Sequence, residues 1–404
     1  MRALVFVLSL GLLLVGVAPA QDSLNVRLIG ICETPSLAYG VVVDGAYAYV
    51  ADGDSGLRII SVADPTHPSE VGHCDTLGMA LGVAVNGNYA YVAAAYSGLS
   101  VISVADPTHP VEVGHCNTPY FALGVAVNGS YVYVAGLDSG LRVISVADPA
   151  HPAEVGFCST HWAHGVAATG NYAFVADLDS GLRVISVADP AHPVEVGHCY
   201  SQGNAGALGV TVDGYHAYVA EATVGLRVIL VADPTRPVEV GYYDTEGNAE
   251  DVAVSGNCAY VADGGSGLRI ISVADPAHPV EVGYYTTPAY ASDVAVSGDY
   301  AYVADLSAGM PIYQFYVGGV DEKPYAEVKT AKSMPTVVRG VLSLTPAASC
   351  KPQATSCLLD ISGRKVMDLR IGANDVSRLA PGVYFVHSSI DTRHSSIARV
   401  VIAK

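Results

Sequence analysis

The sequence predicts an all-β chain built on a seven-bladed β-propeller, with a small β-sandwich domain after it. Three observations carry the prediction. A glycine followed by a short apolar strand recurs at residues 56, 98, 140, 181, 225, 267 and 309, a spacing of 41 to 44 residues. Each interval has the pattern of four short strands. The chain also begins with a copy of the unit's last strand, which favours a closed ring over an open solenoid.

The first half of each unit reads as a β-hairpin. In the third unit, two alternating stretches rich in Val and Tyr flank Asn128-Gly129. Asn-Gly tolerates the positive φ angles of a type I′ turn, so it is a strong hairpin signal. Equivalent hairpins begin at residues 40, 82, 124, 165, 209, 251 and 293.

The second half of the unit supplies two more strands. The third strand leads into an Ala-Asp-Pro-x-His-Pro turn, where each proline fixes φ and withholds an N–H donor. Fourth strands are expected at 70–74, 112–116, 154–158, 195–199, 239–243 and 281–285, which makes six. Residues 26–32 are the seventh copy and precede the first hairpin. We therefore predict that this N-terminal strand completes the last blade of a propeller over residues 24–317.

The strand and turn strings resemble a known repeat. Gly-Leu-Arg-Val-Ile-Ser-Val-Ala-Asp-Pro, at 140–149 and 181–190, and Tyr-Val-Ala-Asp at 49–52 are similar to the LVIVD repeat family. The similarity covers all seven units. It implies a propeller exposed at a cell surface, and no general enzymatic activity.

The first twenty residues have the pattern of a secretory signal peptide. Arg2 precedes an apolar run over 3–17, and Ala18-Pro19-Ala20 matches an A-x-A cleavage site. The run is short for a membrane anchor, the alternative interpretation. No later stretch is apolar for long enough to span a bilayer as a helix. We expect a protein that is secreted or attached to the outer-membrane surface.

Charge separates the chain into two parts. Residues 24–317 contain 7 Arg, no Lys and 30 acidic residues, whereas residues 318–404 contain 12 basic and 7 acidic residues. The acidic body argues against nucleic-acid binding, which requires a basic surface. The change in charge near 318 predicts a domain boundary, with a charged, proline-containing linker over 318–335.

Short strands alternate with turn signals over 336–404, which predicts a β-sandwich. The strings at 359–369, 379–386 and 399–404 resemble the C-terminal sorting domain of type IX secretion substrates. This resemblance implies translocation by the type IX secretion machinery, often with cleavage and surface attachment. Leu344-Thr-Pro-Ala347 departs from the usual opening of that domain. Cys350 and Cys357 are spaced for a hairpin disulfide, and free thiols are the alternative.

Most of the chemically reactive side chains belong to the repeat, and we interpret them as structural. The histidines of the Asp-Pro-x-His-Pro turns are expected to pack in those turns. The repeated arginines are expected to pair with carboxylates between blades. Cysteines 32, 74, 116, 158 and 199 share one slot. Equivalent slots on neighbouring blades should lie beyond the roughly 7 Å Cα limit for a disulfide, which predicts free thiols.

Candidate binding residues lie where the units differ. The loops that enter each blade, and those between its second and third strands, should emerge on one face. Exposed aromatic residues on such a face suit contact with a protein or a glycan; the alternative is packing over the ring mouth. The candidates are Tyr39, Tyr120, Phe121, Trp162, His164 and Tyr290.

Acidic residues form a second candidate site. Asp251 and Asp293 replace the glycine that begins the other inner strands, and Glu250 precedes the first. Carboxylates of adjacent blades near a channel mouth suggest a Ca²⁺ site, and the Asp-x-Asp loops at 52–54 and 177–179 resemble part of a calcium loop. We expect a protein without any cofactor, and Ca²⁺ binding by these carboxylates is the alternative.

No nucleophile, phosphate-binding or zinc motif stands out. The sequence therefore predicts a monomeric, secreted or surface-displayed module that binds a protein or polysaccharide through its loop face. One alternative is a carbohydrate-active or other hydrolase that uses Glu250, Asp251 and Asp293. Two carboxyls about 5–9.5 Å apart over an open pocket would favour it. Another alternative is a structural component of a surface layer or an adhesive.

Overall fold

The computed structural model describes residues 23–201 and 206–316, and the strands between 336 and 402. The predicted signal peptide (1–20), the whole predicted linker (318–335) and Cys350 lie outside the described residues. The chain divides into two compact units, Met1–Val320 and Asp321–Lys404. Among the described residues, no helix is long and apolar enough to cross a membrane.

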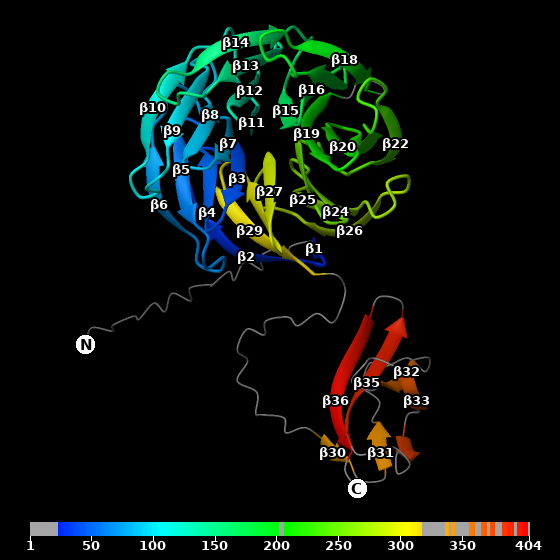
Figure 1. The fold of residues 1–404 in the computed structure, drawn as a ribbon. Coiled ribbons are helices and arrows are strands. Elements are labelled where there is room, and N and C mark those ends of the chain that lie inside the picture. The colour runs from blue at the N-terminus through cyan, green and yellow to red at the C-terminus, as the bar shows by residue number, and fades with distance from the viewer. Residues whose placement is uncertain are drawn as a thin grey trace, which may run out of the picture. The chain divides into compact units, whose positions relative to one another are not determined.

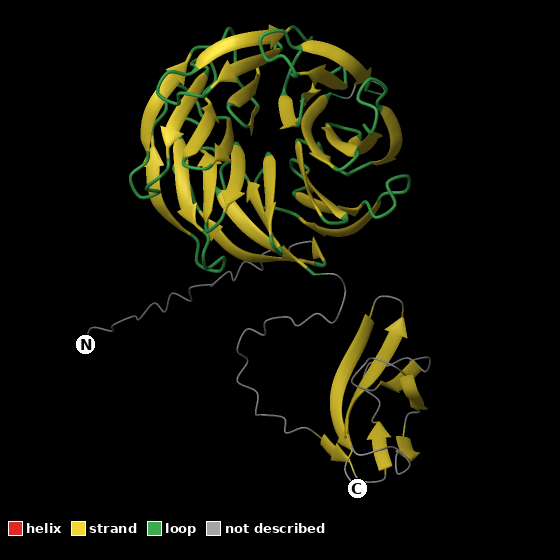
Figure 2. Ribbon diagram, in the orientation of Figure 1, coloured by secondary structure: helices red, strands yellow, loops and turns green. Residues whose placement is uncertain are grey.

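The first unit is a ring of seven antiparallel sheets, which confirms the predicted seven-bladed propeller (Figures 1 and 2). The inner strands are β3 (Gly40–Asp44), β7 (Gly82–Asn86), β11 (Val125–Asn128), β15 (Gly165–Thr169), β19 (Ala207–Asp213), β23 (Asp251–Ser255) and β27 (Asp293–Ser297). The second strands are β4 (Tyr47–Ala51), β8 (Tyr89–Ala93), β12 (Tyr131–Ala135), β16 (Tyr172–Ala176), β20 (His216–Glu221), β24 (Cys258–Ala262) and β28 (Tyr300–Ala304).

The outer half of each blade follows the same order. The third strands are β5 (Leu57–Ser61), β9 (Leu99–Ser103), β13 (Leu141–Ser145), β17 (Leu182–Ser186), β21 (Gly225–Leu230), β25 (Leu268–Ser272) and β29 (Met310–Phe315). The outer strands are β6 (Ser69–Cys74), β10 (Val111–Cys116), β14 (Ala153–Cys158), β18 (Val194–Cys199), β22 (Val238–Tyr243) and β26 (Val280–Tyr285). Blades are numbered from blade 1, which contains β3, to blade 7, which contains β27.

The N-terminal strand closes the ring as predicted. β2 (Val26–Cys32) pairs with β29, with Val26 opposite Phe315 and Cys32 opposite Met310. In Figure 1 the blue β2 therefore lies beside the yellow β29. A preceding strand, β1 (Ser23–Leu24), was not predicted and adds a fifth strand to blade 6 by pairing with β26. Asn25 makes the turn between β1 and β2 at φ 54° and donates a hydrogen bond to the Val282 carbonyl over 2.8 Å.

β1 occupies the place that an Asp-Pro-x-His-Pro turn takes at the other seams. In the other seams, the glycine of an outer strand packs against the Asp-Pro-x-His-Pro turn of the next blade. A Cβ on Gly72, for example, would lie 2.2 Å from the Pro107 carbonyl oxygen. The sequence after β29 has no Asp-Pro-x-His-Pro motif, and a Cβ on Gly283 would instead meet the Leu24 carbonyl at 3.0 Å. The N-terminal segment therefore supplies both the missing strand and the missing packing partner.

The core consists of seven apolar clusters, one in each seam between neighbouring blades. In the seam between blades 3 and 4, Leu141 and Val143 of one blade meet Val175 and Ile185 of the next. The second and third strands contribute most of these side chains because both of their faces are covered by adjacent blades.

The repeated polar residues act locally. Arg183 pairs with Glu195 at 3.0 Å and with Asp177 at 3.2 Å, all within blade 4. The predicted pairing of these arginines between blades is therefore wrong, because neighbouring strands of one blade already bring the carboxylates into reach. The turn histidines hydrogen-bond the turn aspartates, as His67 does with Asp64 at 3.0 Å, which confirms their place in the turns. The described propeller cysteines are free, as predicted.

The second unit is all-β in its described parts. The strands are β30 (Thr336–Val338), β31 (Val341–Leu344), β32 (Thr355–Leu359), β33 (Lys365–Leu369), β34 (Gly372–Asp375), β35 (Gly382–Asp391) and β36 (His394–Ile402). A five-stranded sheet has the order β30-β36-β35-β32-β33, and β31 pairs with β34. The predicted sandwich and sorting domain stay predictions.

Candidate functional site

The two variable sets of loops meet on one face of the propeller. Each loop that enters a blade forms an isolated β-bridge with the loop between the second and third strands of the preceding blade. In one example, Ala163 pairs with Leu137, and the alanine is fully buried. The seven bridges are equivalent around the ring. They fix the entry loops and define what is here called the loop face.

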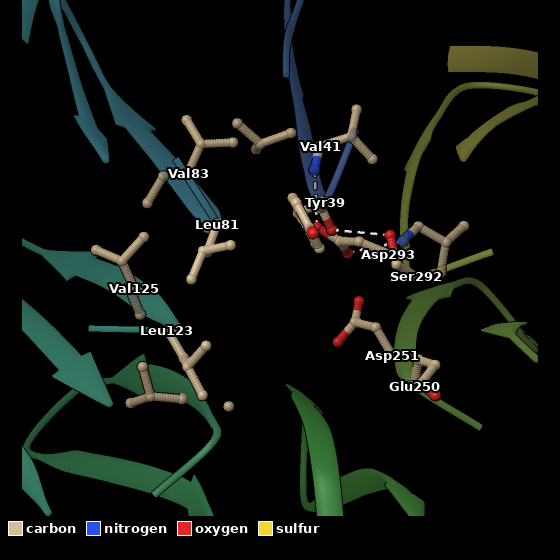
Figure 3. Close-up of a pocket in the computed structure, with 18 of the residues that line it drawn as sticks. Tyr39, Val41, Leu81, Val83, Leu123, Val125, Glu250, Asp251, Ser292 and Asp293 are labelled. Atoms are coloured by element: carbon tan, nitrogen blue, oxygen red, sulfur yellow. Dashed lines mark hydrogen bonds between the residues drawn. The ribbon is translucent and has the colours of Figure 1, made fainter. Parts of the chain in front are cut away.

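A cavity of about 860 Å³ opens at the centre of the loop face. Its two sides differ in chemistry, as Figure 3 shows. Aliphatic side chains of blades 1 to 3 form one side, including Val41, Leu81 and Leu123. Carboxyls of blades 6 and 7 form the other side, and no lysine or arginine lines the cavity. The site therefore combines an apolar wall with an acidic one.

Asp293 joins the last blade to the first. Its carboxylate accepts a hydrogen bond of 2.7 Å from the backbone amide of Val41 (Figure 3). It also accepts one of 2.7 Å from the backbone amide of Val294. Beside it, the Ser292 hydroxyl is within hydrogen-bond distance of the Ala38 and Tyr39 carbonyls, at 3.1 and 3.0 Å. Burial raises the pKa of Asp293, and the hydrogen bonds that it accepts oppose this shift.

Asp251 occupies the equivalent place one blade earlier. Burial, repulsion from Asp293 and a hydrogen bond between the two carboxyls raise the pKa of Asp251 well above its usual value. The two carboxyls begin the inner strands β23 and β27 of adjacent blades, and both line the central cavity. A Cβ on Gly209 would lie 2.3 Å from Asp251 Oδ1, so glycine at that position leaves room for the carboxyl.

Two further polar groups border the acidic side. The Tyr290 hydroxyl donates a short hydrogen bond to Glu250 across the seam between blades 6 and 7. Burial raises the pKa of Glu250, and the bond from Tyr290 opposes this shift. Across the cavity, His164 Nδ1 lies 3.1 Å from the Leu208 carbonyl, and burial lowers the pKa of His164. His164 is therefore expected to be neutral at pH 7.

A second cavity, of about 350 Å³, lies at the rim between blades 2 and 3 and is called the rim pocket below. Tyr96 and Phe121 meet edge to face in it, with ring centroids 4.7 Å apart. The Trp162 indole N–H donates a short hydrogen bond to Asp138 in its wall. The lining residues are Tyr96, Tyr120, Phe121, Leu137 and Asp138.

The structure thus distributes the predicted rim residues between two cavities. Tyr39, His164 and Tyr290 line the central cavity, and Phe121 lines both. Tyr120 lines the rim pocket, and Trp162 contacts its wall. Tyr96 and Asp138 were not among the residues predicted from the sequence. Tyr96 stands at the third position of a loop where blades 1, 3 and 4 have Asp, and that departure was the available signal.

The Asp-x-Asp loops do not have the arrangement of calcium loops. The first aspartate of each is fully buried and holds the entry loop of its own blade. Asp52 accepts the Ser36 amide at 3.0 Å, and Asp177 accepts the amides of His161 and Trp162. Within the described residues, no group of three or more acidic, His or Cys side chains is placed to hold a metal ion, and Glu250, Asp251 and Asp293 do not form one.

A ring of seven blades, each built on four antiparallel strands, with a cavity at the loop end of its central channel defines a seven-bladed β-propeller, a common class of binding module. The chain belongs to the LVIVD repeat family. The family repeat matches residues 37–76, 77–118, 121–160, 162–201, 203–245, 246–287 and 288–312.

Solved structures show the same fold at low sequence identity. A chain of the mitotic checkpoint complex is 12% identical with a TM-score of 0.62, over 78% of this chain and 99% of that chain. The RRP9 WD40 repeats are 13% identical with a TM-score of 0.57, over 74% and 100%. PorZ is described as a surface component of the type IX secretion system of Porphyromonas gingivalis. It is 12% identical with a TM-score of 0.57, and the match covers 94% of this chain and 61% of PorZ. The sequence matches no curated protein.

Proposed function

We propose that this protein is an exported binding module that engages a protein or polysaccharide through the loop face of its propeller. The observation that carries the proposal is the pair of adjoining cavities on that face. They lie where the repeats differ, and aromatic side chains border both. Concave sites with aromatic walls and a few polar groups are typical of binding surfaces.

The repeat itself supports a division of roles. Residues common to the blades are used in turns, ion pairs and seams, as the bonds of Asp177, Arg183 and His67 illustrate. The residues of the entry loops are released from these tasks and differ from blade to blade. A rigid ring that presents variable loops is an arrangement that suits recognition.

Export is supported by the sequence of both ends. The predicted signal peptide and the resemblance of 359–404 to type IX sorting domains favour a secreted or surface-attached protein. Intact-mass measurement of the protein from its native cells tests this proposal. We expect an N-terminus at Gln21 and, where the sorting domain is processed, the loss of the C-terminal domain. A retained leader would contradict export.

A matched set of variants of the full-length protein tests binding. Trp162→Ala combined with Tyr290→Ala changes the loop face, and Tyr215→Ala serves as the control. Tyr215 is 71% exposed and follows the Gly214 hairpin turn at the opposite end of its blade. Wild type and variants are applied to a glycan array and used to capture proteins from envelope extracts. Loss of a ligand in the loop-face variant alone supports the proposal, and equal retention by all three proteins contradicts it.

A further inference from the structure

The rim pocket is unusual in how much aromatic surface it exposes. Tyr96 is 81% exposed and Tyr120 is 64% exposed, and both line the same cavity as Phe121. Tyr120 also holds a φ of 62°, a left-handed conformation that costs a non-glycine residue of order 1–2 kcal/mol. Exposed aromatic rings on a strained loop are a recurrent feature of ligand sites.

The loops that form the rim pocket lack a buried carboxylate that anchors the entry loop in the other blades. In five blades a fully buried carboxylate ends the second strand or follows it, and the residues are Asp52, Asp177, Glu221, Asp263 and Asp305. These carboxylates hold the entry loop of their blade, as Asp305 does through Thr287 and Ala289. Blades 2 and 3 have Ala94 and Gly136 at this position, and these are the blades whose loops form the rim pocket.

The charge of the loop face determines which charge a ligand can carry. Residues 24–317 contain no lysine, and five of the seven arginines pair with carboxylates inside the blades. Of the other two, Arg27 hydrogen-bonds Gln314 in the closing strand and Arg236 lies in a turn at the opposite end of the blades. The described loops of this face therefore offer carboxylates without a free cation. Such a surface repels an acidic ligand and attracts a basic one.

Aromatic faces beside a carboxylate are the side-chain set that recognises an alkylammonium group. A neutral sugar would stack on the aromatic rings, but it carries no charge for the carboxylate to balance. The Asp138 carboxylate is exposed and accepts one hydrogen bond, from Trp162. Because a carboxylate offers about four lone-pair sites, Asp138 can accept a hydrogen bond from a second donor as well.

We propose that the rim pocket binds the side-chain ammonium group of a lysine on a partner protein. The ammonium lies against the rings of Tyr96, Tyr120 and Phe121, and Asp138 provides the countercharge. This inference deepens the proposed function and rests on it for the use of the loop face.

Trp162 provides the readout because it is the single tryptophan of the chain and its indole bonds Asp138. Full-length protein is titrated with N-acetylated trilysine amide, and with the same peptide acetylated on each Nε. We expect a saturable change in tryptophan fluorescence with the charged peptide and none with the acetylated one. Calorimetry of the same titrations provides a readout that does not depend on the indole.

Variants separate the pocket from the general acidity of the protein. Tyr96→Ala keeps the net charge and should weaken trilysine binding about tenfold, whereas Tyr96→Phe should retain it, since either ring binds a cation. Asp138→Asn should weaken binding by a similar factor and reduce its dependence on salt. Tyr215→Ala, on the opposite face, should leave binding unchanged. Because Tyr96 is exposed, an unchanged thermal midpoint is expected and verifies folding.

Equal binding by wild type and Tyr96→Ala would overturn the inference, as would equal binding of the two peptides. A neutral oligosaccharide that binds in a Tyr96-dependent way, with no response to trilysine, would reassign the pocket to sugars and also overturn it. The proposed function is judged separately, by retention of the native ligand in the variant with Trp162→Ala and Tyr290→Ala. If that variant loses the native ligand and trilysine does not bind the wild type, the proposed function is supported. The inference that the rim pocket binds a lysine is then rejected.

Discussion

Neutralising Arg227 should destabilise the propeller much more than neutralising its counterpart Arg142. Arg227 is 2% exposed, bonds the fully buried Glu221 at 2.6 Å and pairs with Glu239. Burial opposes the charge of Arg227, but the two glutamates outweigh this effect and raise its pKa. Arg227→Met leaves Glu221 buried without a countercharge, which costs about 3–5 kcal/mol.

Arg142 is the matched comparison because blade 3 lacks the buried acid. Its partner is the partly exposed Glu154, at 3.2 Å, and Gly136 stands where blade 5 has Glu221. Arg142→Met should therefore cost about 1 kcal/mol, the range of an accessible ion pair. The cation–π contact of Arg142 with Phe157 is lost as well and adds a similar amount at most.

The assay is the thermal midpoint of the full-length protein at pH 7, followed by near-ultraviolet circular dichroism. For a unit of this size, 1 kcal/mol corresponds to about 2 °C. We expect a decrease of about 6–10 °C for Arg227→Met and about 2–4 °C for Arg142→Met. Adding Glu221→Ala to Arg227→Met should recover much of the loss, because the unpaired carboxylate is removed. Equal losses at the two arginines, or no recovery in the double variant, would refute this explanation.

Three other predictions test the acidic pair, the closure and the thiols. Because burial and Asp293 raise the pKa of Asp251 above its unfolded value, stability should be lost as pH rises through the folded pKa. Asp251→Asn should therefore raise the thermal midpoint at about pH 8 and change it little at about pH 4. Asp293→Asn should lower the midpoint, since its two oxygens accept backbone amides; an increase would contradict that role. Asn25→Ala should cost about 1–2 kcal/mol in thermal or denaturant unfolding, because it loses a hydrogen bond and adopts φ 54° less readily. Asn25→Gly should cost less, and equal costs would argue against backbone strain. Burial raises the pKa of Cys32, Cys74, Cys116 and Cys158, so native alkylation of these thiols at pH 7 should be slow and complete only after unfolding; rapid native labelling would exclude this.

The blades were predictable because the same local signals occur seven times. One hairpin signal is ambiguous alone, but seven hairpins in phase with seven outer strands leave little freedom in topology. The prediction failed for β1, because Ser23 and Leu24 are too few residues to show an alternating pattern. It also failed for the arginine pairs. Sequence spacing does not distinguish a carboxylate on the adjacent strand from one on the adjacent blade.

The sequence predicted which face of the propeller carries the candidate site, but it did not predict the two cavities on that face. Entry loops that differ between units indicated Tyr120 and Phe121, and the structure brings both to the rim pocket. The opposite wall of that pocket comes from Tyr96 of the preceding blade and from Asp138. Their proximity depends on the bridges between neighbouring blades, which have no sequence signature of their own.

The closing seam explains why an acid stands at the start of β27. β2 pairs with β29 at the outer edge of the ring, and Val26 meets Phe315, which lies 289 positions later in the sequence. The other blades form from contacts within one repeat, whereas blade 7 must wait for both ends of the propeller. At the channel, Asp293 bonds the Val41 amide and Ser292 bonds the Ala38 carbonyl across the seam between blades 7 and 1. Strand pairing within blade 7 therefore closes the ring at its outer edge, and polar bonds between blades 7 and 1 hold it at its inner edge. Asp293 has this structural role whether or not a ligand occupies the central cavity, so ligand recognition is better sought on the loops than at this carboxylate.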